Sequence, residues 1–525
     1  MGNGLFLLNG TVRALDGTVA EGVACREGRV VALGRSEELR ALVQAGDEVV
    51  DLSGRLVLPA FSDAHCHFAA FALSRREVDL RGVTSLAEAV RRVGAVAAQG
   101  RGWITGRGWL HDAWGGQQPT RQLLDQVVPN RPVALWRNDH HAVWVNSLAL
   151  ALAGITATTP DPPGGVILRE ANGEPSGVLL ERAAELVRRR IPPPSVAELA
   201  EAIVQAAPLA HREGIAAVYC PEGLAAYQAY RLLHQQGRLP LRVGMCLATD
   251  DFEAERALLA AEGQGDAWLH WTHLKLYADG ALGPRTAWML EPYDDDQANT
   301  GVVVTPPEEL GAWIRRAAAH GVGCAIHAIG DAANRAALDQ LAATRAHWAP
   351  AGLRPRIEHA QCLHPADIPR FAALGVVASL QPIHALQDMP VAVRAWGKRV
   401  LTAYPLRSLL ESGARLAFGS DAPVETLSVL AGLRAACLPP EEGTVASAWQ
   451  AAQTVPLAAA VAAYTRGAAW AEGREHERGT LTPGALADLV VLDRDLLALP
   501  IEALREVQVV GTVIGGQWVY RNFPA

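Results

Sequence analysis

The sequence predicts an α/β fold: a (β/α)8 TIM barrel with a small β-sandwich formed by both termini and an inserted subdomain after the first barrel strand. Three observations predict it. Apolar strands alternate with amphipathic helices along most of the 525 residues, and side chains of metal-binding type close several of those strands. Both ends of the chain are rich in short β-like runs broken by glycine.

The alternation is clearest in the C-terminal two-thirds, where four segments place a glycine between a helical stretch and an apolar strand. Glycine suits the left-handed turn that ends a helix, and short continuous apolar runs are typical of parallel strands covered on both faces. An open doubly wound sheet is the alternative, but the strand count favours the barrel. The expected strands are residues 56–68, 215–220, 241–247, 274–277, 322–327, 356–359, 376–381 and 414–419.

Two regions depart from this alternation and give the expected domain boundaries. Residues 1–54 and about 477–525 are expected to form one composite β-sandwich, and the barrel to span 55–476. The Trp-rich and Pro-rich stretch at about 80–195 is too long for a loop between a strand and its helix, so we expect an inserted subdomain. Its tryptophans either contact an apolar or aromatic group of the substrate or form the subdomain's own core.

Composition and charge narrow the function classes. The formal net charge is −8, and no basic stripe could neutralise phosphates, so nucleic acid is not an expected partner. No apolar run approaches the roughly 18 residues that cross a bilayer, so no membrane partner is expected. Seven cysteines without a CxxC pair do not resemble a disulfide framework, which favours a cytoplasmic location. We expect a small-molecule substrate, and a homodimer is left open.

Candidate metal ligands stand at the ends of the expected strands. His65 and His67 end the first strand, and because residues i and i+2 of a strand face the same side, both imidazoles can point into the barrel. Two imidazoles on one face suit a divalent metal such as zinc, although one such pair arises readily by chance. His327, His359 and Asp421 end three later strands, at the face that holds the active site in this fold. A shared metal site explains the whole set better than separate structural roles.

Lys275 is the least obvious member of the set, because it lies at the end of an otherwise apolar strand. A buried lysine must be paired, neutralised or chemically modified. The structural alternative is a lysine at the barrel rim that extends its amine into water.

Taken together, these residues make the chain resemble the amidohydrolase superfamily. Within it the chain looks like the YtcJ-like branch, amidohydrolase family 3, which is related to N-substituted formamide deformylases. The resemblance runs nearly end to end and rests on an ordered set of motifs. These are LPAFSDAHCH from residue 58, KLYADGALGPRTA from 275, HAIGD from 327, IEHAQ from 357, GSDAPV from 419 and GALADLVVLD from 484.

The resemblance implies a metal centre with zinc as the expected ion and one or two divalent ions per subunit. Asp421 would lie near the metal-bound water, and Lys275 would be carboxylated so that its carbamate bridges two metals. The ligands that the family pattern implies are His65, His67, Lys275, His327, His359 and Asp421.

The resemblance also implies substrate contacts. Residues 137–146 are similar to a family segment that approaches the substrate, which makes Arg137 and His141 candidates, together with Asp279 and Arg285 in the second motif. Two positions depart from the family pattern without touching a ligand position. They are His140 and Ala60, each where glycine is usual.

The predicted function is a metal-dependent hydrolase that cleaves a non-peptide C–N bond, of the amide or formamide type, through a metal-activated water with Asp421 as general base. A metal-dependent deaminase is the alternative within the superfamily. Its members usually carry a glutamate three residues after the His of the fifth strand, where this chain has Gly330. A catalytically silent ligand-binding protein is a third reading; it predicts lost ligands, and none is missing.

Overall fold

The computed structural model describes residues 4–98, 102–137, 141–439 and 450–524. The chain divides into two compact units, one made of residues 1–71 with 203–525 and the other of residues 72–202. The larger unit contains the barrel and the sandwich, and the smaller one includes the stretch at about 80–195 where the insertion was expected. The domain boundaries given above stay a prediction.

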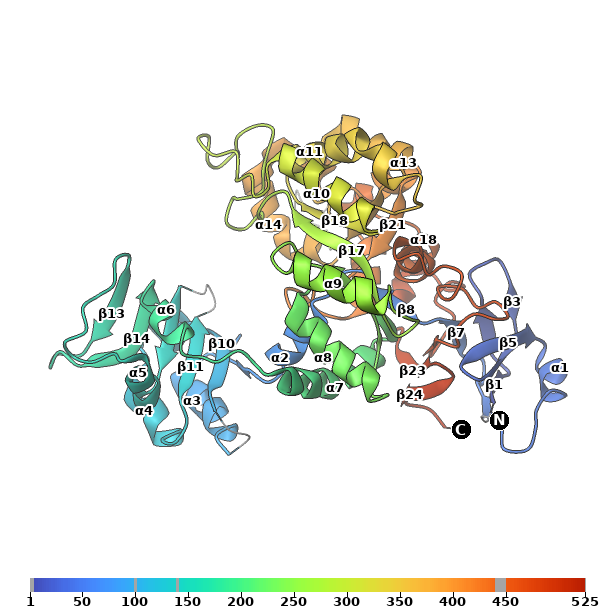
Figure 1. The fold of residues 1–525 in the computed structure, drawn as a ribbon. Coiled ribbons are helices and arrows are strands. Elements are labelled where there is room, and N and C mark those ends of the chain that lie inside the picture. Colours follow the sequence, from blue (N-terminus) through green and yellow to red (C-terminus); the bar gives the residue numbers. More distant parts are fainter. Residues whose placement is uncertain (1–3, 99–101, 138–140, 440–449, 525) are drawn as a thin grey trace. The chain divides into compact units, whose positions relative to one another are not determined.

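Eight parallel strands form the centre of the larger unit and confirm the predicted barrel (Figure 1). Their order in the sheet is their order in the chain, from β8 through β15 to β21, with each strand hydrogen-bonded to the next. The strands are β8 (Phe61–Asp63), β15 (Ile215–Cys220), β16 (Arg242–Leu247), β17 (Leu269–Tyr277), β18 (Gly323–Ala328), β19 (Arg356–His359), β20 (Val377–Leu380) and β21 (Arg415–Phe418).

The first and last strands meet just beyond their carboxyl ends. The N–H of Ala64 donates to the carbonyl of Phe418 at 3.0 Å, and the N–H of Asp421 donates to the carbonyl of His65 at 2.7 Å. Gly419 allows this approach, because a Cβ at that position would lie 2.4 Å from the backbone nitrogen of His65. The closure therefore places two candidate ligand segments side by side.

Helices connect the barrel strands (Figure 1). The glycine predicted at each of four helix–strand junctions adopts a positive φ, from 71° at Gly321 to 85° at Gly413, as a left-handed helix end requires. The helices between strands include α7 (Val196–Arg212), α8 (Leu224–Gln235), α9 (Phe252–Glu262), α10 (Pro307–Ala319), α11 (Asp331–Ala343), α13 (Ile368–Leu374), α14 (His384–Trp396) and α15 (Leu406–Glu411). Others are α1 (Ser36–Arg40), α2 (Phe68–Ser74), α12 (Arg345–Trp348), α16 (Val429–Cys437), α18 (Leu457–Ala462) and α19 (Ala468–Ala471).

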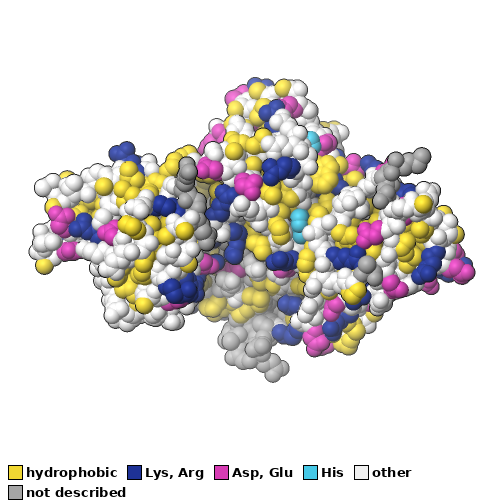
Figure 2. Space-filling model, turned by 90° about the horizontal axis from the view of Figure 1, so that it is seen from below, with side chains coloured by type: hydrophobic (Ala, Val, Ile, Leu, Met, Phe, Trp, Pro, Cys, Tyr) yellow, Lys and Arg dark blue, Asp and Glu magenta, His cyan; other side chains and the backbone are white. Residues whose placement is uncertain are grey.

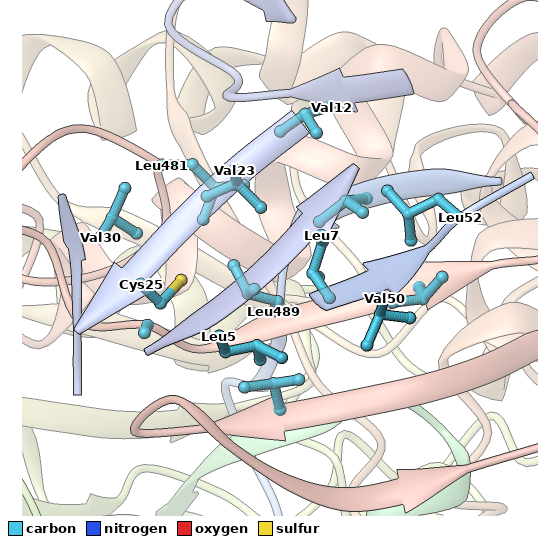
Figure 3. Close-up of a cluster of buried hydrophobic side chains, with 14 of the residues drawn as sticks. Leu5, Leu7, Val12, Val23, Cys25, Val30, Val50, Leu52, Leu481 and Leu489 are labelled. Carbon is cyan, nitrogen blue, oxygen red and sulfur yellow. The ribbon is translucent and has the colours of Figure 1, made fainter. Parts of the chain in front are cut away.

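Both termini build the predicted sandwich. One sheet has the order β5-β4-β1-β6 and the other β24-β23-β22-β7-β2-β3, so strands from the two ends of the chain pair with one another. Apolar side chains of the two sheets share one core, with Leu5, Leu7 and Val50 close to Leu489 (Figure 3). The strands are β1 (Leu5–Leu8), β2 (Thr11–Arg13), β3 (Val19–Ala20), β4 (Gly22–Arg26), β5 (Arg29–Gly34), β6 (Glu48–Asp51), β7 (Leu56–Pro59), β22 (Leu489–Leu492), β23 (Val509–Ile514) and β24 (Gln517–Arg521).

The strand expected over residues 56–68 is in fact two strands. β7 pairs with β2 and β22 in the sandwich, and only β8 joins the barrel. Ala60 between them donates its N–H to the carbonyl of Asp488 at 2.9 Å. The Asp488 carboxylate in turn forms a buried ion pair with Arg242 of β16, at 2.6 Å. The chain therefore passes from sandwich to barrel within one residue, five residues before His65.

The smaller unit has its own core. Trp109, Trp114 and Trp144 are almost wholly buried together, and the first two rings stack with their centroids 5.9 Å apart. These tryptophans therefore form the subdomain's core, as one of the two readings expected. The elements are β9 (Val78–Asp79), β10 (Ile104–Trp109), β11 (Val133–Arg137), β12 (Ala142–Val145), β13 (Gly165–Arg169), β14 (Pro175–Glu181), α3 (Leu86–Ala95), α4 (Arg121–Val127), α5 (Ser147–Ala153) and α6 (Ala184–Arg188).

The length of the described helices and the distribution of surface charge concern two partner classes, membranes and nucleic acids. Among the described residues, no helix is both long enough and apolar enough to span a bilayer. On the face shown in Figure 2, Lys and Arg side chains are scattered among Asp and Glu rather than gathered in a stripe.

Candidate metal centre

Six predicted ligands from five barrel strands line one cavity of about 340 Å³ at the carboxyl ends of the strands. The imidazole centroid of His65 lies 5.5 Å from that of His67 and 5.0 Å from that of His359, and His327 lies 4.5 Å from His359. The structure thus brings together side chains that are up to 356 positions apart in the chain. The set is His65, His67, Lys275, His327, His359 and Asp421.

Asp421 lies among the histidines. Its Oδ1 is 3.3 Å from Nε2 of His67 and 3.6 Å from Nε2 of His65. Burial opposes ionisation of this carboxyl, but the hydrogen bond from His67 and the nearby His65 and His384 outweigh it and lower its pKa. The backbone of Asp421 has φ of 58°, an unfavourable value for a residue with a side chain, and its bond to the His65 carbonyl helps to hold it.

Hydrogen bonds decide which ring nitrogen of three histidines faces the cavity. Nδ1 of His65 lies 2.6 Å from Oε2 of Glu358, and Nδ1 of His359 lies 2.8 Å from Oε1 of Gln381. Both rings therefore donate through Nδ1 and leave the Nε2 lone pair for a metal. His327 has the opposite tautomer, since its Nε2 donates to the carbonyl of Gly280 at 2.9 Å and leaves the Nδ1 lone pair for a metal.

Beneath His65 lies a buried ion pair. Arg356 donates to Glu358, to the Ser379 hydroxyl at 2.6 Å and to the carbonyl of Ala64. Burial disfavours the Glu358 carboxylate, but Arg356 and His65 outweigh burial and hold the pKa of Glu358 well below its ordinary value. Glu358 is thus a permanent anion that orients His65 and makes the ring a stronger ligand.

Lys275 is buried, with 4% of its surface exposed. Burial lowers the pKa of its amine. Within the described part of the chain, Nζ has no hydrogen bond or ion pair, and the centroid of the Tyr277 ring lies 5.0 Å from it. The amine is therefore neither extended into water nor paired with a carboxylate, so of the expected alternatives a neutral or modified lysine fits best.

The donor set fits a divalent metal. Two groups of three side chains each have their ligand atoms within 4.8 Å of one another: His65, His67 and Asp421 in one, and His359, His384 and Asp421 in the other. Imidazole nitrogen with carboxylate oxygen is the ligand chemistry that zinc and similar ions prefer. Burial also keeps the imidazoles neutral, since it lowers the pKa of His65 to about 4 and that of His327 to about 3.

Sequence reasoning missed several residues of this site. His384, the first residue of α14, has Nε2 3.6 Å from Oδ2 of Asp421 and Nδ1 3.2 Å from the Gln361 amide nitrogen. Asp63 is buried and accepts from the N–H groups of His65 and Ser420, which fixes the junction of β8 and β21. Gln381 could have been found from the sequence, because it ends an expected strand as the predicted ligands do. His384 lies on a helix, and no feature of the sequence places it at the site.

The residues predicted to contact substrate lie in different places. Asp279 is buried below the cavity lining, where it accepts from the N–H groups of Trp288, Ile329 and Gly330 and holds the segment after β17. Burial raises its pKa to about 7, against the effect of those bonds. Arg285 forms an ion pair with Asp295 at 2.6 Å and is not among the residues that line the cavity.

The other two candidates belong to residues 72–202. Arg137 ends β11, and Nδ1 of His141 lies 3.0 Å from Oε2 of Glu181 in the same unit. His140, one of the two departures from the family pattern, lies outside the described residues. A substrate contact by Arg137 or His141 stays a prediction.

The sequence profile of the amidohydrolase family (Amidohydro_3) matches residues 48–520. The chain belongs to the amidohydrolase family. It is accordingly a hydrolase of the metal-dependent amidohydrolase superfamily, and it is similar over nearly its whole length to two members of the predicted branch. The putative amidohydrolase YtcJ of Bacillus subtilis is 32% identical, covering 97% of each chain. The N-substituted formamide deformylase of Arthrobacter pascens is 30% identical, covering 99% of this chain and 98% of that one.

Two further proteins extend the similarity. The protein LONG AFTER FAR-RED 3 of Arabidopsis thaliana is 34% identical, covering 98% of this chain and 91% of that protein. A solved structure, described as an uncharacterized metal-dependent hydrolase from Pyrococcus furiosus, is 31% identical with a TM-score of 0.78. It covers 94% of this chain and 100% of that chain. The barrel fold is therefore shared with an experimentally determined structure.

Proposed function

We propose that this amidohydrolase cleaves a non-peptide C–N bond of a small molecule, of the amide or formamide type, with one or two divalent ions, zinc foremost. The observation that carries the proposal is the convergence of neutral, hydrogen-bonded imidazoles and an ionised carboxylate on one cavity. A divalent ion at such donors would lower the pKa of water from about 15.7 to about 7 and polarise the scissile carbonyl.

The proposed residues act in distinct ways. The ligands would be His65, His67, His327 and His359, with Asp421 beside them. The ionised Asp421 carboxylate would accept a proton from the attacking water and then deliver it to the leaving nitrogen, because an amine leaves poorly unless it is protonated.

Lys275 would be carboxylated in the active protein. Its unprotonated Nζ would attack carbon dioxide, forming an N–C bond and releasing a proton. The resulting carbamate would offer anionic oxygen to the divalent ions. The buried amine without a carboxylate partner supports this assignment.

One observation disfavours the deaminase alternative. Gly330 occupies the position where deaminases of the superfamily usually carry a catalytic glutamate. A Cβ at Gly330 would lie 1.9 Å from the carbonyl oxygen of Trp288, so no larger residue fits there without movement of that backbone.

The test makes two measurements on protein purified without chelators. Elemental mass spectrometry gives the metal content, and an assay with a panel of N-formyl and N-acetyl amines measures the release of free amine. We expect stoichiometric divalent metal and amine release. Ammonia release from amino-substituted heterocycles with no amine release would favour the deaminase. Absence of metal together with no turnover would favour the silent ligand-binding protein.

A further inference from the structure

The cavity that holds the metal ligands also has an acidic outer wall. Asp388 of α14 and Glu425, four residues after Asp421, line it; we call these two the rim carboxylates. Among the described lysines and arginines, only Lys275 lines the same cavity, and it lies with the metal ligands. Two carboxyl groups therefore face a small space that offers them no permanent cation.

The contacts of the rim carboxylates are with neutral groups. The Tyr404 hydroxyl donates to Oδ2 of Asp388 at 2.5 Å, and the Gln387 amide donates to Oε2 of Glu425 at 2.7 Å. Neither carboxylate forms an ion pair with a basic side chain in the described part of the chain. Each carboxyl group has acceptor lone pairs left for a further donor. Burial, with Asp388 adding to it, raises the pKa of Glu425 to about 7, which shows how poorly its charge is compensated.

Two further polar atoms of the cavity lack partners. Gln361 and His384 are 4% and 7% exposed, and the bond between the Gln361 amide and Nδ1 of His384 leaves Oε1 of Gln361 and Nε2 of His384 without a hydrogen bond to any described residue. Buried polar groups are rarely left unsatisfied, so a bound ligand is the natural partner. The Gln361 oxygen is a third acceptor in the same cavity as the rim carboxylates.

The remaining walls are apolar. Tyr277, Leu282, Ile329 and Val424 line the cavity beside the carboxylates. An aromatic ring also attracts a cation to its face. A ligand that satisfies these walls has a compact apolar body and a positively charged nitrogen that donates hydrogen bonds.

We propose that the rim carboxylates Asp388 and Glu425 select substrates that carry an ammonium or guanidinium group a short distance from the scissile bond. This specificity rests on the proposed C–N hydrolysis and names its substrate class, small amides that bear a second, cationic nitrogen. The cation would form ion pairs with the rim carboxylates while the amide reaches the metal ligands.

The test compares benzylguanidinium with benzylurea, which has nearly the same shape and no charge. Guanidinium stays protonated, so it does not compete as a metal ligand. Binding to the metal-loaded protein is measured by calorimetry. We expect benzylguanidinium to bind at least about tenfold more tightly, and Glu425→Gln or Asp388→Asn to weaken it by about tenfold while leaving benzylurea unchanged. Equal affinities for the two probes, or equal effects of the variants on both, would overturn the proposal.

A matched control and a metal measurement sharpen the result. Glu309→Gln removes an exposed carboxylate in the first turn of α10 and should alter neither affinity. A fall in metal content of Glu425→Gln or Asp388→Asn would show that the rim carboxylates hold a metal ion, which also overturns the proposal.

Turnover separates this inference from the proposed function. The monoformyl derivative of a short diamine should show a lower KM than that of the alkylamine of equal length, and Glu425→Gln should remove the difference with little change in kcat. Hydrolysis of both with equal KM would refute the cation preference alone. Tight guanidinium binding without hydrolysis of any amide would refute the proposed reaction alone.

Discussion

Oε2 of Glu358 lies 2.6 Å from Nδ1 of His65, and both side chains are almost wholly removed from water. Because Arg356 keeps Glu358 ionised, the contact is charge-assisted and sets both the tautomer and the orientation of the His65 ring. Metal affinity should therefore depend on a residue that does not line the cavity.

Glu358→Gln should weaken metal binding by roughly 10- to 100-fold, since the amide is a poorer acceptor for the His65 ring. Competition with a chromogenic chelator measures the affinity. The variant also leaves Arg356 buried without its anion, at a stability cost of about 3–5 kcal/mol. The double variant Arg356→Met with Glu358→Gln removes both charges and should recover stability but not affinity. Unchanged affinity in a folded variant would contradict the role given to Glu358.

Asp421→Asn should retain most of the metal and lower kcat by roughly 10²- to 10⁴-fold, the usual contribution of a general base. The amide keeps an oxygen near His67 but cannot accept a proton. Metal content and amine release are measured on the same preparation. Full activity in this variant would remove Asp421 from the proton transfer.

Lys275→Met should remove the bridging carbamate and reduce the metal content if two ions are bound. Native mass spectrometry of the parent protein should show the added mass of one carbon dioxide, lost on acidification. A crystal structure in which the density ends at Nζ, with full activity in that preparation, would exclude carboxylation.

Gly419→Ala should destabilise the protein by about 1–3 kcal/mol, because its Cβ would press on the backbone nitrogen of His65. Metal affinity should fall with stability, since the same contact positions His65 and Asp421. Thermal unfolding and metal titration test both effects. The control is Gly34→Ala, whose Cβ would meet only the flexible end of Glu38; equal behaviour of the two variants would argue against a tight closure.

Metal-stripped protein should lose stability as the pH falls below about 6.5. Burial lowers the pKa of His65 and of His273 to about 4 and that of His327 to about 3, so the unfolded chain binds protons that the folded chain does not. The stability from these neutral rings is fully present above pH 6.5. It declines until the pH reaches the folded pKa values, by on the order of 3–5 kcal/mol per ring. A Tm that stays constant between pH 7 and pH 5 would contradict this.

The barrel and the ligand segments could be predicted because their signals are local. Helix, glycine and apolar strand follow one another within a few residues, and a strand end identifies the face where His327 or Asp421 lies. On β19 this reasoning needs one correction. Alternation along the strand places Arg356 and Glu358 on one side and predicts His359 on the other, yet His359 lines the cavity. Its φ is 74°, which no residue type in the sequence indicates.

Other parts of the site depend on tertiary structure. Asp388 and Glu425 lie on a helix and a loop that only the closed barrel brings together, so no spacing in the sequence predicts their proximity. The split of the first strand is similar, because the carbonyl of Asp488, more than 400 residues away, defines where β7 ends and β8 begins.

Through this junction, the C-terminal residues help to position the metal ligands. β22, which begins next to Asp488, braces the peptide that leads directly into the His65 segment. A chain shortened by its last forty residues would keep every metal ligand in its sequence. It would nevertheless lose the strand and the hydrogen bond that hold the segment leading into His65. Lesions at the far end of the gene should therefore resemble active-site mutations.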